Sequence, residues 1–148
     1  MSPNPSPEGV FTTRRQYPFS AAQIHAAFAH GDRLAAWWGP AGFSNTFETF
    51  EFQPQGRWSF VMHGPDGANY RNDCVFIETS PHQVIIRHLS VPQFTLTVSW
   101  AESDGLSTLD WHQAFDDPTV AAHVAHIVLP SNEQNLDRLQ AALTQAAA

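Results

Sequence analysis

Hydrophobic and polar residues alternate with a period of two through the middle of the chain, from about residue 43 to residue 115. The clearest runs begin at Trp58, Phe94 and Leu109, where nearly every second residue is apolar. This alternation is typical of antiparallel strands with one buried and one solvated face. Turn-forming residues such as Pro65-Asp66-Gly67 separate the runs. The segment therefore predicts about six strands in a meander.

A further strand and two short helices are predicted before this segment. The strand covers residues 10–17, and its arginines indicate an edge or a solvated face. Ser20 and Gln23 form a capping box that predicts the start of the first helix, which Gly31 ends. Asp32 is expected to cap the second helix, and Gly39-Pro40 stops it.

The C-terminal part of the chain has helical spacing. Asp117-Pro118 places a proline at the first helical position, which favours a helix start. Pro130 interrupts the apolar stripe that follows, and Ser131 to Gln134 forms a second capping box. The pattern predicts one kinked helix or two successive helices. The stripe consists of Val120, Val124, Ile127, Val128, Leu136, Leu139 and Leu143.

A long sheet with one substantial helix must curl around that helix to bury its apolar face. We therefore expect an α+β fold, in which a curved antiparallel sheet wraps a long C-terminal helix and the two short helices close one end. Residues 9–148 are expected to form this one domain. Residues 1–8 contain three prolines and are expected to form an extended or disordered tail. This geometry tends to leave an apolar cavity between sheet and helix.

Composition excludes several classes of partner. The net charge is −7, and the seven basic residues, all arginine, form no cluster. Nucleic acids and anionic membrane surfaces are therefore poor partners, because both attract basic patches. No apolar run is long enough to span a membrane, and the N-terminus lacks the features of a secretory signal. Cys74 is the only cysteine and excludes an internal disulfide, so we expect a cytoplasmic location.

Aromatic residues make up 12% of the chain, which suits a pocket for a flat apolar ligand as well as an aromatic core. Strand parity places two polar residues, His88 and Gln113, on the apolar face, where they would orient a ligand or bond within the core. Trp37 and Trp38 are expected to point to different sides of their helix, one at the cavity mouth and the other against the sheet edge. Phe43 is expected near the same mouth. The remaining predicted lining residues are Phe60, Met62, Phe94, Trp111 and Phe115 from the sheet and Val124 and Ile127 from the helix.

Candidate chemistry is sparse. His123 and His126 lie three apart on a predicted helix, with His112 as the nearest third ligand, but this spacing is a weak metal signal and we expect no metal and no cofactor. Cys74 has no catalytic context, and the sequence contains no nucleophile elbow or phosphate loop. Acid–base chemistry by His88 is the one catalytic alternative, and no catalytic residue is assigned.

Four stretches carry a resemblance to a known family. They are Arg33-Leu-Ala-Ala-Trp-Trp-Gly-Pro40, Gly56-Arg-Trp58 with the following Met62 to Gly67, Leu109 to Phe115, and Asn135 to Leu139. Together they resemble the START-like or SRPBCC superfamily, and most closely the domain of the activator of heat-shock protein 90 ATPase homologues. The sequence departs from the family pattern at residues 53–56, Gln-Pro-Gln-Gly in place of Arg-Pro-Gly-Gly, and at Cys74, which replaces a glycine.

The resemblance implies a helix-grip fold and often a homodimer, but no single activity. Relatives include ligand carriers, polyketide cyclases, oxygenase domains and co-chaperone domains, and fold is a weak guide among them. The leading hypothesis is binding of a small hydrophobic or aromatic ligand. The alternatives are a cyclase- or hydrolase-like enzyme acting on a polyketide-like substrate, and a co-chaperone-type domain that binds another protein.

Overall fold

The computed structural model describes residues 6–147 of the 148-residue chain. The predicted tail, residues 1–8, lies mostly outside the described residues. The elements are, in chain order, β1 (Val10–Tyr17), α1 (Ala21–Ala29), α2 (Gly31–Trp37), β2 (Ser44–Phe50), β3 (Arg57–His63), β4 (Asn69–Ser80), β5 (Gln83–His88), β6 (Phe94–Ser103), β7 (Leu106–Phe115) and α3 (Pro118–Ala147).

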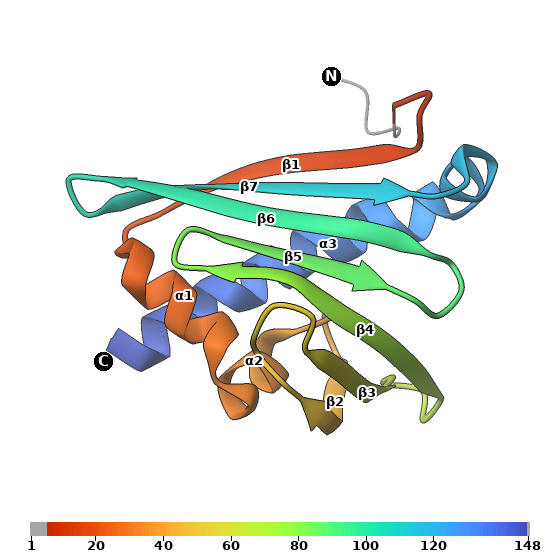
Figure 1. Cartoon of the computed structure of the whole chain (residues 1–148), viewed down its shortest axis with the longest axis horizontal. Coiled ribbons are helices and arrows are strands. Elements are labelled where there is room, and N and C mark those ends of the chain that lie inside the picture. The colour runs from red at the N-terminus through yellow and green to blue at the C-terminus, as the bar shows by residue number, and fades with distance from the viewer. Residues whose placement is uncertain (1–5, 148) are drawn as a thin grey trace.

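One antiparallel sheet holds all seven strands, in the order β1-β7-β6-β5-β4-β3-β2. Strands β2 to β7 form a meander, and β1 pairs with β7 along its whole length, from Val10 opposite Ala114 to Tyr17 opposite Ser107. In Figure 1, α3 runs behind the sheet, and α1 and α2 lie at its lower end. The predicted fold class, the six-strand meander and the edge position of the first strand are confirmed.

The two short helices follow each other almost without a break. Ser20 and Gln23 form the expected capping box at the start of α1. His30 serves as the C-cap of α1 and as the N-cap of α2. The predicted capping roles of Gly31 and Asp32 are therefore wrong: Gly31 is the first residue of α2, and Asp32 lies in its first turn.

The C-terminal segment is a single helix of 30 residues with Pro130 inside it. Ser131 to Gln134 therefore continue the helix and do not cap a second one. The face of α3 that packs against the sheet carries small residues first, Ala121 and Ala125, and then leucines from Leu136 onward. Alanines let the helix axis approach the sheet closely at its N-terminal end, because they have almost no side chain to accommodate.

Side-chain bonds fix α3 against the first strand. The buried hydroxyl of Tyr17 donates to the carbonyl oxygen of Leu136 at 2.9 Å. Two residues earlier, Arg15 forms ion pairs with Glu133 at 2.9 Å and with Asp137 at 2.8 Å. Because both anchors lie in the second half of α3, this half is held in one position relative to the sheet.

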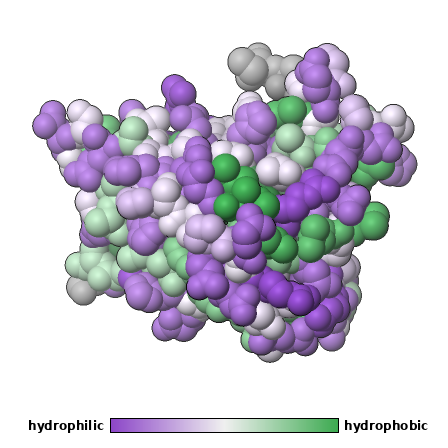
Figure 2. All heavy atoms as spheres, in the orientation of Figure 1, coloured by the Kyte–Doolittle hydropathy of each residue, from purple (hydrophilic) through white to green (hydrophobic). Residues whose placement is uncertain are grey.

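The outer face of the sheet is mostly polar. Figure 2 shows this face as largely hydrophilic, with a small apolar group near its middle and right. Ion pairs such as Arg14–Asp110 and Arg87–Asp116 lie on exposed or half-buried side chains of the sheet and its ends. No helix among residues 6–147 is long and apolar enough to cross a membrane.

Candidate functional site

A cavity of about 230 Å³ lies between the concave face of the sheet, the second half of α3 and the loop after α2. None of the residues around it is an acid, a lysine or an arginine. Its lining consists of Trp38, Gly39, Pro40, Phe60, Met62, Asn72, Cys74, Ile86, His88, Phe94, Leu96, Trp111, Gln113, Ser131, Asn132 and Asn135.

The structure brings together most of the residues that the sequence analysis placed in a cavity. They are Trp38, Phe60, Met62, His88, Phe94, Trp111 and Gln113. Whether these residues bind a ligand stays a prediction, because no ligand is present.

The two adjacent tryptophans have different surroundings. Trp38 lies against Trp111, with ring centroids 6.0 Å apart, and borders the cavity. Trp37 is only 1% exposed, packs edge-on against Phe28, and donates its indole N–H to the carbonyl oxygen of Ala27 at 3.1 Å. Trp38 is therefore the residue of the pair that borders the cavity, and Trp37, which is also a predicted lining residue, lies in the core outside it.

Four other predicted lining residues also lie outside the cavity. Phe43 follows the loop after α2 and lies against Tyr70, with centroids 6.1 Å apart. Phe115 packs edge-on against Phe11 in a separate cluster at the far end of the sheet, and Val124 covers that cluster. Ile127 is 56% exposed. The prediction failed for the two helical residues because, in the first half of α3, alanines and not the larger apolar residues occupy the face that meets the sheet.

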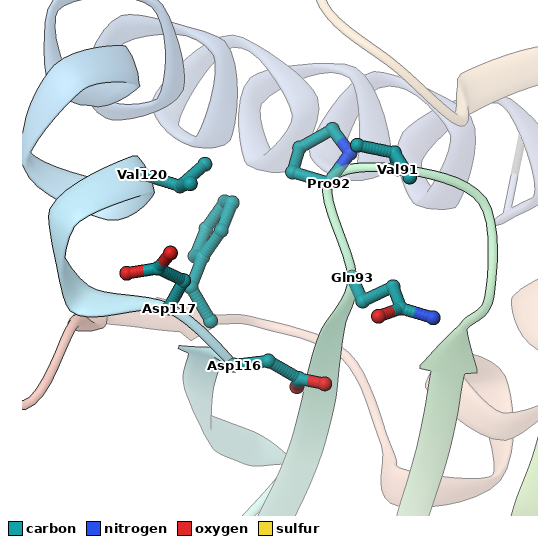
Figure 3. Close-up of a pocket in the computed structure, with 7 residues that line it drawn as sticks. Val91, Pro92, Gln93, Asp116, Asp117 and Val120 are labelled. Carbon is teal, nitrogen blue, oxygen red and sulfur yellow. The ribbon is translucent and has the colours of Figure 1, made fainter.

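Phe115 borders a second, smaller hollow of about 160 Å³ at the start of α3. Figure 3 shows Val120 of α3 and Pro92 of the β5–β6 loop on its two sides. Its two carboxylates already have partners: Asp116 forms two bonds to Arg87, at 2.7 and 2.6 Å, and Asp117 accepts from the backbone N–H of Thr119 at 2.9 Å. The carboxylate of Asp116 is therefore paired with a cation, and that of Asp117 caps the first turn of α3.

His88 lies in the wall of the main cavity with both ring nitrogens engaged. Nδ1 donates to the carbonyl oxygen of Pro92 at 3.0 Å, and Nε2 lies 2.7 Å from the side-chain amide oxygen of Asn72. The ring stacks on Phe94 at 4.4 Å. Burial lowers the pKa of His88, although the bond to Pro92 opposes this shift. A ring held in this way is a poor general base, because neither nitrogen is free to take a substrate proton.

The helical side of the cavity carries uncharged polar groups. Asn132 donates its side-chain N–H to the Oε1 atom of Gln113 at 2.9 Å, across the space between α3 and β7. Asn135 is 6% exposed, and its Oδ1 atom accepts from the backbone N–H of Gly39 at 3.2 Å. These amides replace the apolar side chains that a closed core would place at the same positions.

Two buried indole nitrogens have no hydrogen-bond partner among the described residues, those of Trp58 and Trp111. An unpaired buried donor costs about 1–3 kcal/mol. Trp58 is enclosed by other aromatic rings, whereas Trp111 borders the cavity. Only the donor of Trp111 therefore lies where a bound molecule could pair with it after a small shift.

Arg138 fixes the loop that forms the cavity rim. Its guanidinium donates to the carbonyl oxygens of Trp38, Gly39 and Pro40 at 2.9–3.0 Å and to that of Ala36 at 3.0 Å. It forms no ion pair with a carboxylate within residues 6–147. Burial lowers the pKa of Arg138. The charge is stabilised by backbone dipoles, which also hold the rim against α3.

Gly39 allows this rim to lie close to the sheet. Its φ of +97° is in the left-handed region that favours glycine. A Cβ atom at this position would lie 2.7 Å from the terminal methyl of Met62, which lines the cavity. A side chain at position 39 would therefore strain the backbone and displace Met62.

Cys74 lines the cavity, but its buried thiol is a poor nucleophile. Burial raises the pKa of its thiol to about 12, so that the reactive thiolate is scarce at neutral pH.

The three histidines considered as metal ligands, His112, His123 and His126, are exposed. Within residues 6–147 no group of three or more His, Cys, Asp or Glu side chains is arranged to hold a metal ion.

The sequence analysis missed the polar residues of α3 and several strand residues. Leu96 shares strand parity with the predicted Phe94, and Asn72 shares it with Cys74, so alternation carried a signal for these two. Asn132 and Asn135 carried no such signal, because polar residues on a helix usually face water.

The fold and the cavity define a helix-grip domain, a class of α+β proteins that enclose a space between a curved sheet and one long helix. Residues 18–144 match the family described as Activator of Hsp90 ATPase homolog 1-like protein, and the chain belongs to this family. No curated protein matches the chain.

Solved structures share the fold at low sequence identity. A protein from Arthrobacter aurescens has a TM-score of 0.86 at 20% identity, over 93% of this chain and 87% of that one. A protein from Rhodobacter sphaeroides has a TM-score of 0.82 at 22% identity, over 95% of each chain. The AHSA1 protein of Silicibacter pomeroyi has a TM-score of 0.73 at 18% identity, over 93% of this chain and 99% of that one.

Proposed function

We propose that the protein binds a small, flat, uncharged ligand in the cavity between the sheet and α3. The observation that carries this proposal is the composition of the lining. Aromatic and aliphatic side chains cover the sheet side, uncharged amides cover the helix side, and no residue with a fixed charge is present. Ligand sites commonly combine apolar walls with a few polar groups that fix orientation.

The size of the cavity limits the ligand. Cavities of roughly 150 Å³ can hold a benzene molecule, and sites for drug-sized ligands run from about 300 to 1,000 Å³. A space of about 230 Å³ lies between these cases. It suits a compound with one or two fused rings better than a long acyl chain.

A binding titration with a matched pair of variants tests the proposal. Met62→Trp should fill the cavity from its rim, whereas Ile127→Trp adds the same side chain to an exposed position on α3. Bicyclic aromatic compounds, added during amide NMR spectra, should shift the signals of cavity residues in the wild type and in Ile127→Trp but not in Met62→Trp. Equal binding by both variants would refute the cavity as the site.

Family membership favours one other function. The family description refers to activation of the Hsp90 ATPase, so a protein-binding role is the second candidate. Addition of the purified chain to an Hsp90 ATPase assay tests it, and a saturable rise in ATP hydrolysis would support it. The enzymatic alternative has less support, because His88 uses both ring nitrogens within the protein.

A further inference from the structure

Two side chains around the cavity carry N–H groups that no acceptor among the described residues takes. The carbonyl oxygens at the rim, those of Trp38, Gly39 and Pro40, already accept from Arg138.

The orientation of Asn135 leaves a donor free. A backbone N–H can only donate, so the N–H of Gly39 requires the Oδ1 atom of Asn135 on its side. The NH₂ group of Asn135 is therefore turned away from Gly39, and it makes no hydrogen bond to any residue in the described part of the chain. Asn135 is 6% exposed and lines the cavity, so a bound molecule is the natural partner for this NH₂ group.

Trp111 adds a second free donor. An indole nitrogen donates and never accepts. Trp111 is 2% exposed, borders the same cavity and has no partner for this nitrogen within residues 6–147. Asn135 and Trp111 therefore each present an unpaired donor, and both residues line the same small space.

The absence of charged residues from the lining restricts which kind of acceptor a ligand could present to these donors. A carboxylate would lose its hydration on entering the cavity, which is unfavourable unless a cation pairs with it. The guanidinium of Arg138 already donates to four backbone carbonyls and is not available for such a pair. A carbonyl oxygen of a ketone or quinone needs no such partner. Its attached ring would lie on the apolar side, near Phe94 and Leu96.

From these contacts we propose that the cavity selects aromatic ketones or quinones, whose carbonyl oxygen accepts from Asn135 and Trp111. This inference rests on the proposed ligand-binding function and specifies its ligand class.

Four compounds of similar shape separate the possibilities: indanone, indane, aminoindane and indane carboxylate. We expect indanone to bind the wild-type chain about tenfold more tightly than indane, which corresponds to about 1.4 kcal/mol. NMR titration measures the dissociation constants. Equal affinity of indanone and indane, or tightest binding of the amine or the carboxylate, would overturn the inference while leaving a cavity that binds ligands. Failure of all four compounds to bind would overturn the proposed function and this inference together.

Three substitutions locate the effect. Asn135→Asp keeps an oxygen for the N–H of Gly39 but removes the free donor, so the preference for indanone should disappear and aminoindane should gain affinity. Trp111→Phe removes the second donor and keeps an aromatic ring. It provides the same test of the preference for indanone if Asn135→Asp does not fold. Trp58→Phe is the matched control, because it removes an equally unpaired indole N–H away from the cavity. A preference for indanone that survives both cavity variants, or that Trp58→Phe also abolishes, would contradict the assignment.

Discussion

Two regions of the concave face are both rich in aromatic residues, yet one is closed and the other is open. Trp58 stacks on Phe60 at 4.4 Å and on Phe76 at 5.4 Å, and its side chain is fully buried. Trp111 has one aromatic neighbour, Trp38, at 6.0 Å, and the cavity lies beside it. Aromatic content is therefore not what marks the site. The difference lies in the opposite wall, where Trp58 meets other rings and Trp111 meets a helix face that carries amides.

The largest expected effect comes from removing the central ring of each region. Trp58→Ala should lower the free energy of unfolding by an amount near the upper end of about 3–5 kcal/mol, because close-packed neighbours cannot fill the void. Trp111→Ala should cost an amount near the lower end, because its ring already borders empty space. Urea denaturation of both variants measures the difference. A larger loss for Trp111→Ala would contradict the contrast between a closed and an open region.

A smaller effect is expected at the rim of the open region. Arg138→Met removes the donors to three loop carbonyls and to the Ala36 carbonyl of α2. We expect a loss of about 2 kcal/mol, near one charge-assisted hydrogen bond, since water can reach part of the loop. Arg14→Met breaks an exposed pair with Asp110 and should have a much smaller effect, because water screens that pair. Thermal unfolding compares the two arginines. Similar losses for both would mean that the loop is held by other contacts.

The smallest effect concerns pH. Because the pKa of His88 is lowered in the folded protein, the unfolded chain takes up this proton more readily once the pH falls below about 6.5. His88 therefore destabilises the fold as the pH falls from 7 towards 5. His88→Gln should flatten this part of the curve of unfolding free energy against pH. The pKa of His25 is also lowered by burial, so some dependence should remain. An unchanged curve for His88→Gln would show that His88 does not contribute.

Strand alternation explains why so much of the fold could be predicted. In β1, the predicted bounds agree with the structure, and in β5 the parity of His88 correctly placed it on the inner face. A period of two needs only a few residues to be recognised, and one buried face fixes the register of every strand.

Helix faces were harder to predict, for a physical reason. Valines and isoleucine suggested one stripe on α3, whereas the buried face begins with Ala121 and Ala125. Alanine buries little apolar area, so a prediction from the pattern of large apolar residues overlooks it. Close packing of a helix against a sheet nevertheless favours alanine, because its side chain is small. Asn135 is the converse case, a polar residue that is buried because the cavity and the rim loop give it partners. Partners that are distant in sequence leave no local pattern.

Gly39 has a consequence for how relatives of this protein could come to accept different ligands. Its missing side chain leaves the methyl group of Met62 where it is, and that methyl forms part of the cavity wall. The space offered to a ligand is thus set partly by a backbone position and not only by the residues that touch the ligand. A change at residue 62 would alter this space directly, whereas a side chain at position 39 would strain the backbone even if residue 62 were smaller.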